Sequence, residues 1–97
     1  MTHEALTAVL VETIDLLRQC GRPDRADWLA ERLRILRRDD ATAEVRKRAV
    51  AELHGVVLGM GGLMDIVVEP PSESKLSPRS ARERLDELAD KLFDLTR

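Results

Sequence analysis

The chain has 97 residues, 43% of them hydrophobic and 35% charged, which is typical of a soluble, mostly helical protein with one modest core. Its net charge of −2 gives no general attraction to nucleic acid or to a membrane surface, and no apolar run approaches the roughly 18 residues needed to span a bilayer. A single cysteine excludes an internal disulfide, and nothing in the sequence resembles a secretory signal. We therefore expect one helical domain over residues 1–97, located in the cytoplasm, with no nucleic-acid or membrane partner.

A first helix is predicted over His3–Cys20, because apolar residues recur there at helical spacing and Gly21 and Pro23 then end the pattern. Cys20 falls within the apolar arc of this helix. A reactive thiol needs an electropositive and accessible setting, which this pattern does not indicate. We interpret Cys20 as a small buried hydrophobic residue.

A second helix is predicted from Pro23 to about Arg38, since proline favours the first helical position and arginine the carboxyl end. Trp28 and Ile35 lie one heptad apart, to one side of the main apolar stripe, with Arg32 between them. One interpretation is that a wide face of this helix is buried between two neighbouring helices. The other is that these three residues form a partly exposed anchor for a partner, because Trp and Arg are enriched at interface hot spots.

A third helix, capped by Asp40 or Thr42, is predicted to lead into Val56–Val68, the least polar stretch of the chain. Three of the five glycines lie in this stretch: Gly59, Gly61 and Gly62. Closely spaced glycines indicate a backbone with positive φ or in close contact with another segment. We expect the chain to leave the helix there, turn sharply and run extended through Leu63–Val68.

Asp65 is the only charged residue within Val56–Val68. A carboxylate among apolar residues needs hydrogen-bond donors or a cation, because burying it unpaired is costly. Structurally, Asp65 would accept hydrogen bonds from the amides of the glycine turn. Functionally, it would be the acidic contact of a partner site. Phosphate binding is not expected, because the glycines follow a helix and lack the Lys-Ser/Thr ending of a phosphate loop.

The two prolines Pro70-Pro71 end the apolar stretch and exclude a helix there. A fourth helix is predicted to open with Ser77 as its cap, or with Ser80 and Glu83 as a capping box. Its leucines recur at three-four-three spacing: Leu85, Leu88, Leu92 and Leu95. Two heptads are too few for a coiled coil, so this helix is predicted to pack into a bundle.

The residues that could carry chemistry show no catalytic or metal-binding arrangement. His3 and His54 have no ligand spacing with each other or with Cys20. Spacing alone assembles no nucleophile, base and orienting group, so we expect no enzyme, no cofactor and no metal. Basic residues gather around the connection between the second and third predicted helices. Without aromatic platforms or a nucleic-acid motif we interpret them as a solvated face.

Three sequence features resemble a family of small bacterial proteins of unknown function. They are the Trp28-Leu29 pair on a helix, the acidic break at Asp39-Asp40, and the segment Gly59–Ile66, which is similar to a Gly-Met-Gly-Ser-Leu-Asn-Asp type of sequence. The resemblance covers about Leu17–Val68, and here Gly62 and Met64 stand where that family has Ser and Asn. It implies a helical fold and no particular activity.

Together these patterns predict an all-α protein, a four-helix bundle with a short extended Gly-rich and apolar segment between the third and fourth helices. The function expected from them is a non-catalytic protein–protein interaction module, an immunity-type or regulatory partner of another protein. The alternative is a homodimeric structural or accessory module. Trp28, Arg32 and Ile35 are the candidate contact residues, and the glycines with Asp65 are the candidate structural turn.

Overall fold

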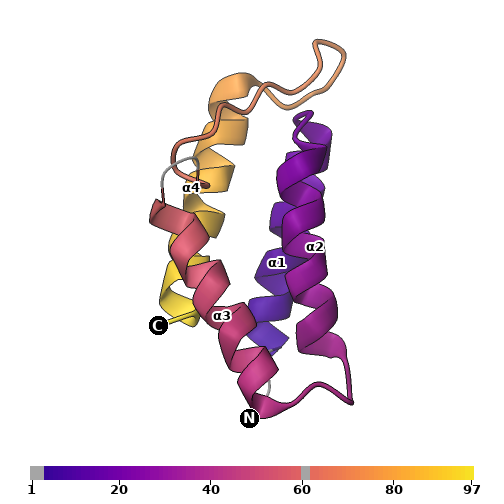
Figure 1. Ribbon diagram of the computed structural model, residues 1–97. Helices are drawn as coiled ribbons and strands as arrows, with labels where there is room; N and C mark the ends of the chain where they lie inside the picture. Colours follow the sequence, from indigo (N-terminus) through magenta and orange to yellow (C-terminus); the bar gives the residue numbers. More distant parts are fainter. Residues whose placement is uncertain (1–3, 60–61) are drawn as a thin grey trace.

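The computed structural model describes residues 4–59 and 62–97 and contains four α-helices in these ranges (Figure 1). They are α1 (Glu4–Gln19), α2 (Pro23–Arg37), α3 (Ala43–Leu58) and α4 (Pro78–Leu95). Successive helices run in opposite directions, and each packs against the helices before and after it, with α4 closing the ring against α1. The chain is therefore an up-down-up-down four-helix bundle measuring 43 × 22 × 20 Å, and the predicted fold class is confirmed.

Local signals in the sequence explain most helix ends. Thr42, rather than Asp40, caps α3 by accepting a hydrogen bond from the Val45 amide at 3.2 Å. Ser77, rather than Ser80, caps α4 by accepting from the Ser80 amide at 3.1 Å. Helix α1 ends at Gln19, and Gly21 follows in the turn to α2 with a φ of +71°, which glycine adopts at no steric cost.

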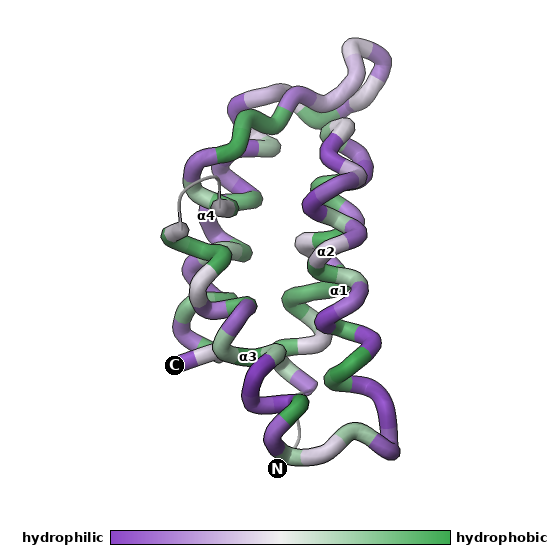
Figure 2. Tube along the Cα trace, viewed as in Figure 1, coloured by the Kyte–Doolittle hydropathy of each residue, from purple (hydrophilic) through white to green (hydrophobic). Residues whose placement is uncertain are grey.

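The core of the bundle is built mainly from leucine. Apolar and polar residues alternate along each helix, as Figure 2 shows, so that one face of every helix turns inward. The most deeply buried large side chains come from all four helices and from the α3–α4 connection: Leu10, Leu17, Leu29, Leu53, Leu63, Leu85, Leu88 and Leu92. Cys20 is buried as predicted, and this burial raises the pKa of its thiol. None of the helices in the described ranges is both long and apolar enough to cross a bilayer.

His54 contributes to the packing between α3 and α4. Its side chain is half-buried and stacks on Phe93 of α4, with 4.4 Å between ring centroids. Its Nδ1 lies 2.9 Å from the hydroxyl of Thr96, which itself donates to the Leu92 carbonyl. These contacts join α3 to the carboxyl end of α4.

The α3–α4 connection differs from the predicted extended run over Leu63–Val68. Residues 63–66 form a turn, in which the amides of Asp65 and Ile66 both donate to the Gly62 carbonyl, at 3.0 and 3.2 Å. From Val67 to Pro71 the chain has neither helix nor turn structure. The β-branched residues pointed to extended backbone, but the turn places Leu63 and Ile66 in the core, where burial outweighs local propensity.

Candidate interaction surfaces

The three candidate contact residues of α2 lie together, and Arg32 is at their centre. The Arg32 guanidinium lies over the Trp28 ring, 4.0 Å from its centroid, and donates to the Trp28 carbonyl at 3.2 Å. It also pairs with Glu31 at 3.3 Å and with Glu52 of α3 at 3.5 Å. The Arg32 side chain is only 16% exposed. These contacts use Arg32 to join α2 to α3.

Trp28 and Ile35 are both half-buried and pack against the core. Trp28 also borders a surface hollow of about 490 Å³ whose other lining residues are mostly charged: Arg18, Asp24, Asp27, Ala30, Glu31 and Arg34. The arrangement therefore has features of both interpretations, a wide buried face and an accessible aromatic edge. A contact with a partner through Trp28, Arg32 and Ile35 stays a prediction.

The turn after α3 is held against the last turn of that helix. The amide of Leu63 donates to the Val56 carbonyl at 2.9 Å, and the amide of Met64 donates to the Val57 carbonyl at 3.3 Å. At Gly62 this approach leaves no room for a side chain, because a β-carbon would lie 2.1 Å from the Val56 oxygen. Close contact, and not positive φ, is therefore the reason for glycine at this position.

Gly59 and Asp65 are the other described members of the candidate turn. Gly59 follows α3 with an ordinary φ of −66°, its amide donates to the Gly55 carbonyl at 3.0 Å, and a β-carbon there would lie 2.7 Å from the same oxygen. Gly61 lies outside the described residues. Asp65 is exposed, so the cost of burying a carboxylate does not apply to it. That its carboxylate stabilises the turn amides stays a prediction.

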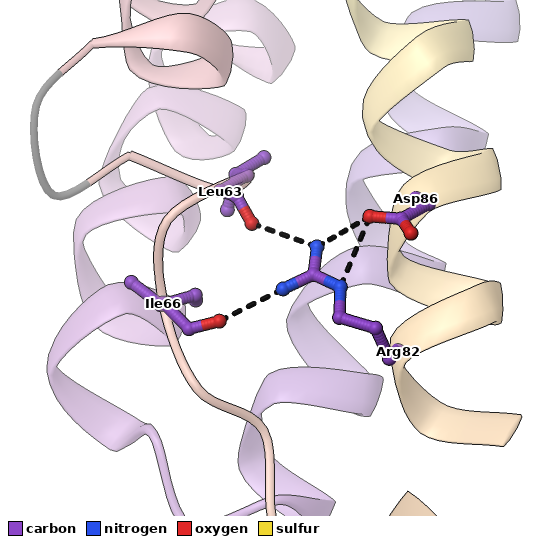
Figure 3. A network of polar contacts seen from close by, with 4 residues as sticks. All are labelled: Leu63, Ile66, Arg82 and Asp86. Carbon is purple, nitrogen blue, oxygen red and sulfur yellow. Dashed lines mark hydrogen bonds and ion pairs between the residues drawn. The ribbon is translucent and has the colours of Figure 1, made fainter. Parts of the chain in front are cut away.

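Arg82 of α4 holds the turn from the other side (Figure 3). Its guanidinium donates to the carbonyl of Ile66 at 2.8 Å and to the carbonyl of Leu63 at 3.1 Å. The carboxylate of Asp86, one helical turn further along α4, accepts from the same guanidinium at 2.6 and 3.0 Å. The i,i+4 spacing of Arg82 and Asp86 is visible in the sequence, but their contact with the turn is not.

Apolar side chains are exposed on the segment that these contacts hold. Of the five large hydrophobic side chains that are exposed in the described ranges, three belong to this segment: Leu58, Met64 and Val67. Their exposed fractions are 66%, 40% and 64%. We call these three side chains the turn surface. The sequence analysis singled out this stretch for its glycines but did not distinguish its exposed side chains from its buried ones.

A groove between α1 and α4 has no counterpart in the sequence analysis. It has a volume of about 570 Å³ and lies between the second half of α1 and the first half of α4. Leu16 and Leu76 contribute apolar lining, and four carboxylates surround it: Glu12, Asp15, Glu83 and Glu87. Arg84 of α4 crosses toward α1 and pairs with Glu12. The acidic spacing on each predicted helix was visible, but the pairing of these two helices was not.

In the ranges that the structure describes, no group of three or more His, Cys, Asp and Glu side chains is placed to hold a metal ion. Comparison with known proteins gives no relative, since no protein-family model, no curated protein and no solved structure matches the chain. The resemblance of Gly59–Ile66 to the bacterial family stays an expectation. Function has to be argued from the surfaces themselves.

Proposed function

We propose that this protein is a non-catalytic protein–protein interaction module that contacts its partner through the turn surface. The observation that carries the proposal is the exposure of Leu58, the last residue of α3, and of Met64 and Val67 on the connection that follows it. Single exposed apolar side chains are ordinary, but a concentration of them on one segment marks contact sites in soluble proteins.

The way this connection is held supports the proposal. Two backbone hydrogen bonds tie Leu63 and Met64 to α3, and two more from Arg82 tie the same turn to α4. A contact surface that is already ordered loses less conformational entropy when a partner binds. Leu63 and Ile66, which are buried, fix the turn to the core, while the neighbouring side chains face solvent.

Two kinds of partner fit this surface. An immunity-type or regulatory protein would cover the turn surface with a different chain. In the alternative, a second copy would cover it, and the protein would be a homodimeric structural or accessory module. The solution mass of the purified protein separates the two, because only the second gives a dimer in the absence of any other chain.

The test replaces exposed apolar side chains with lysine. Leu58→Lys combined with Val67→Lys should weaken the association by at least about tenfold, because each lysine would have to be desolvated at the contact. The matched control is Val45→Lys, since Val45 is 42% exposed but lies in the first turn of α3, at the far end of that helix. Circular dichroism should show the same helical content in all three proteins.

The readouts are sedimentation velocity of the purified chain and affinity capture from its native host, followed by titration of the captured protein. A partner, or a dimer, that is lost in the double variant and kept in the Val45 variant supports the proposal. A partner that both variants retain equally contradicts it, as does a monomer that captures nothing from its host.

A further inference from the structure

The α1–α4 groove has the dimensions of a short helical segment. Residues 12–19 of α1 and 80–87 of α4 each cover about two helical turns, or about 10 Å. Two packed helices leave a groove between their side-chain ridges, and a third helix can lie in such a groove. Leu76 is half-buried and offers apolar contact inside it, while Leu16 belongs to the core and lines the groove with the 6% of its surface that is exposed.

The charge of the groove is strongly negative. Its lining holds four carboxylates and one guanidinium, a net charge of −3, whereas the whole chain carries −2. Arg84 is shared, since it pairs with Glu12 and, at 3.2 Å, with Glu87. Glu83 also pairs with Arg79 at 3.5 Å, and this guanidinium lies outside the lining of the groove and offsets part of its charge. Asp15 is exposed on the α1 side.

We propose that this groove binds a basic amphipathic helix of a partner protein, with one apolar residue against Leu16 and Leu76 and Lys or Arg residues one turn to either side. The proposal rests on the proposed function and names the chemistry of the partner. The carboxylates are spread over two helices and about two turns, so a row of separate cationic side chains matches them better than one ion.

The position of the groove fits one partner covering both surfaces. Leu76 belongs to the same α3–α4 connection as Val67, and this connection passes over the end of the bundle where α1 meets α2 (Figure 1). Val67 lines a shallow hollow there with Cys20 and Gly21. A partner that covers Val67 therefore reaches the end of the bundle where the groove begins.

A second copy of the chain fits the groove less well. The chain's own basic residues gather at the α2–α3 connection, and they include Arg37, Arg38, Lys47 and Arg48. This connection lies at the opposite end of the bundle from the groove. It also lies on the opposite side, because in the described ranges α1 and α3 do not pack together. A two-fold dimer could not pair both patches with each other, and a head-to-tail contact would give a ring or an open chain of many copies and not a dimer.

The test uses the full-length ¹⁵N-labelled protein and a side-chain-bridged helical peptide with a leucine stripe flanked by lysines. We expect amide shifts to concentrate in residues 12–19 and 80–87. Asp15→Lys should weaken binding by about tenfold, because it reverses a charge facing the groove. The matched control, Asp39→Lys, makes the same charge change at the α2–α3 connection and should change binding by less than about twofold.

The proposal is overturned if the peptide gives no shifts, if a matched peptide with Glu in place of Lys binds equally well, or if the shifts lie elsewhere. Concentration-dependent self-association that Arg37→Glu abolishes would assign the groove to a second copy and would also overturn it. The Leu58→Lys, Val67→Lys double variant should bind the peptide normally. If this variant no longer binds its natural partner, and the peptide binds neither the unmodified protein nor any variant, only the groove proposal is wrong and the proposed function stands.

Discussion

Two glycines near the carboxyl end of α3 have opposite surroundings. At Gly62 the carbonyl oxygens of Val56 and Gly59 occupy the space that a β-carbon would take, at 2.1 and 2.7 Å. At Gly55, inside α3, nothing lies within 4 Å of that position. The sequence pointed to the glycine-rich turn, and the structure shows that backbone crowding is what requires glycine at residue 62.

Gly62→Ala should therefore lower the free energy of unfolding by about 1–3 kcal/mol, the usual range for overpacking. The new methyl group would push the turn away from α3 and weaken the hydrogen bonds of Leu63 and Met64. Urea denaturation measures the change. Gly55→Ala is the control and should stabilise by about 0.5–1 kcal/mol, because alanine favours a helix interior. Equal effects of the two substitutions would show that crowding at residue 62 is not the cause.

At the scale of elements, one arginine joins α4 to the turn that follows α3. Arg82 donates hydrogen bonds to two backbone carbonyls of the turn after α3, and Asp86 orients its guanidinium. Its side chain is 32% exposed, so water weakens these contacts without removing them. The link replaces the regular hydrogen bonding that a strand or a helix would have given this segment.

Arg82→Gln should lower stability by about 1–3 kcal/mol, because it leaves carbonyl acceptors unpaired at a partly buried site. It should also speed amide exchange at Met64 and Ile66 more than in the middle of α1. Arg79→Gln is the matched control, since Arg79 is 91% exposed and pairs only with Glu83, and it should change stability by less than about 0.5 kcal/mol. Unchanged exchange in the turn of the Arg82 variant would mean that the turn is held by its contacts with α3 alone.

In the molecule as a whole, the leucine core holds the four helices together, and acidic and basic side chains gather on different parts of the surface. Acidic side chains surround the α1–α4 groove, while basic side chains gather at the opposite end of the bundle. Such a distribution orients an approaching charged partner and has little effect on stability. Packing of the core, by contrast, determines stability.

Leu53→Ala and Leu88→Ala should each cost about 2–5 kcal/mol, because both side chains are at most 1% exposed and their removal leaves a cavity. Thermal and urea unfolding measure the loss. Leu58→Ala makes the same substitution at a side chain that is 66% exposed and should cost less than about 0.5 kcal/mol. If Leu58→Ala costs as much as the two core variants, Leu58 supports the fold and the proposed function loses its main residue.

The helices, most of their caps and their buried faces could be predicted from local sequence patterns. These features depend on periodicity and on interactions between neighbours in the chain, so proline, glycine, serine and threonine placed most helix ends within one or two residues. The same local signals indicated that Cys20 and Leu88 belong to the core. They gave the spacing of Trp28, Arg32 and Ile35 but not the pairing of Arg32 with Glu52 of another helix.

Contacts between residues that are far apart in the sequence could be identified from the three-dimensional structure alone. The packing of the helices brings together three pairs of groups: Val56 with Gly62, Arg82 with the Leu63 carbonyl, and Glu12 with Arg84. The spacing of these residues along the chain does not predict that they meet. The turn at 63–66 replaced the expected extended run for the same reason, since burial of Leu63 and Ile66 against the bundle outweighed the local preference of β-branched residues.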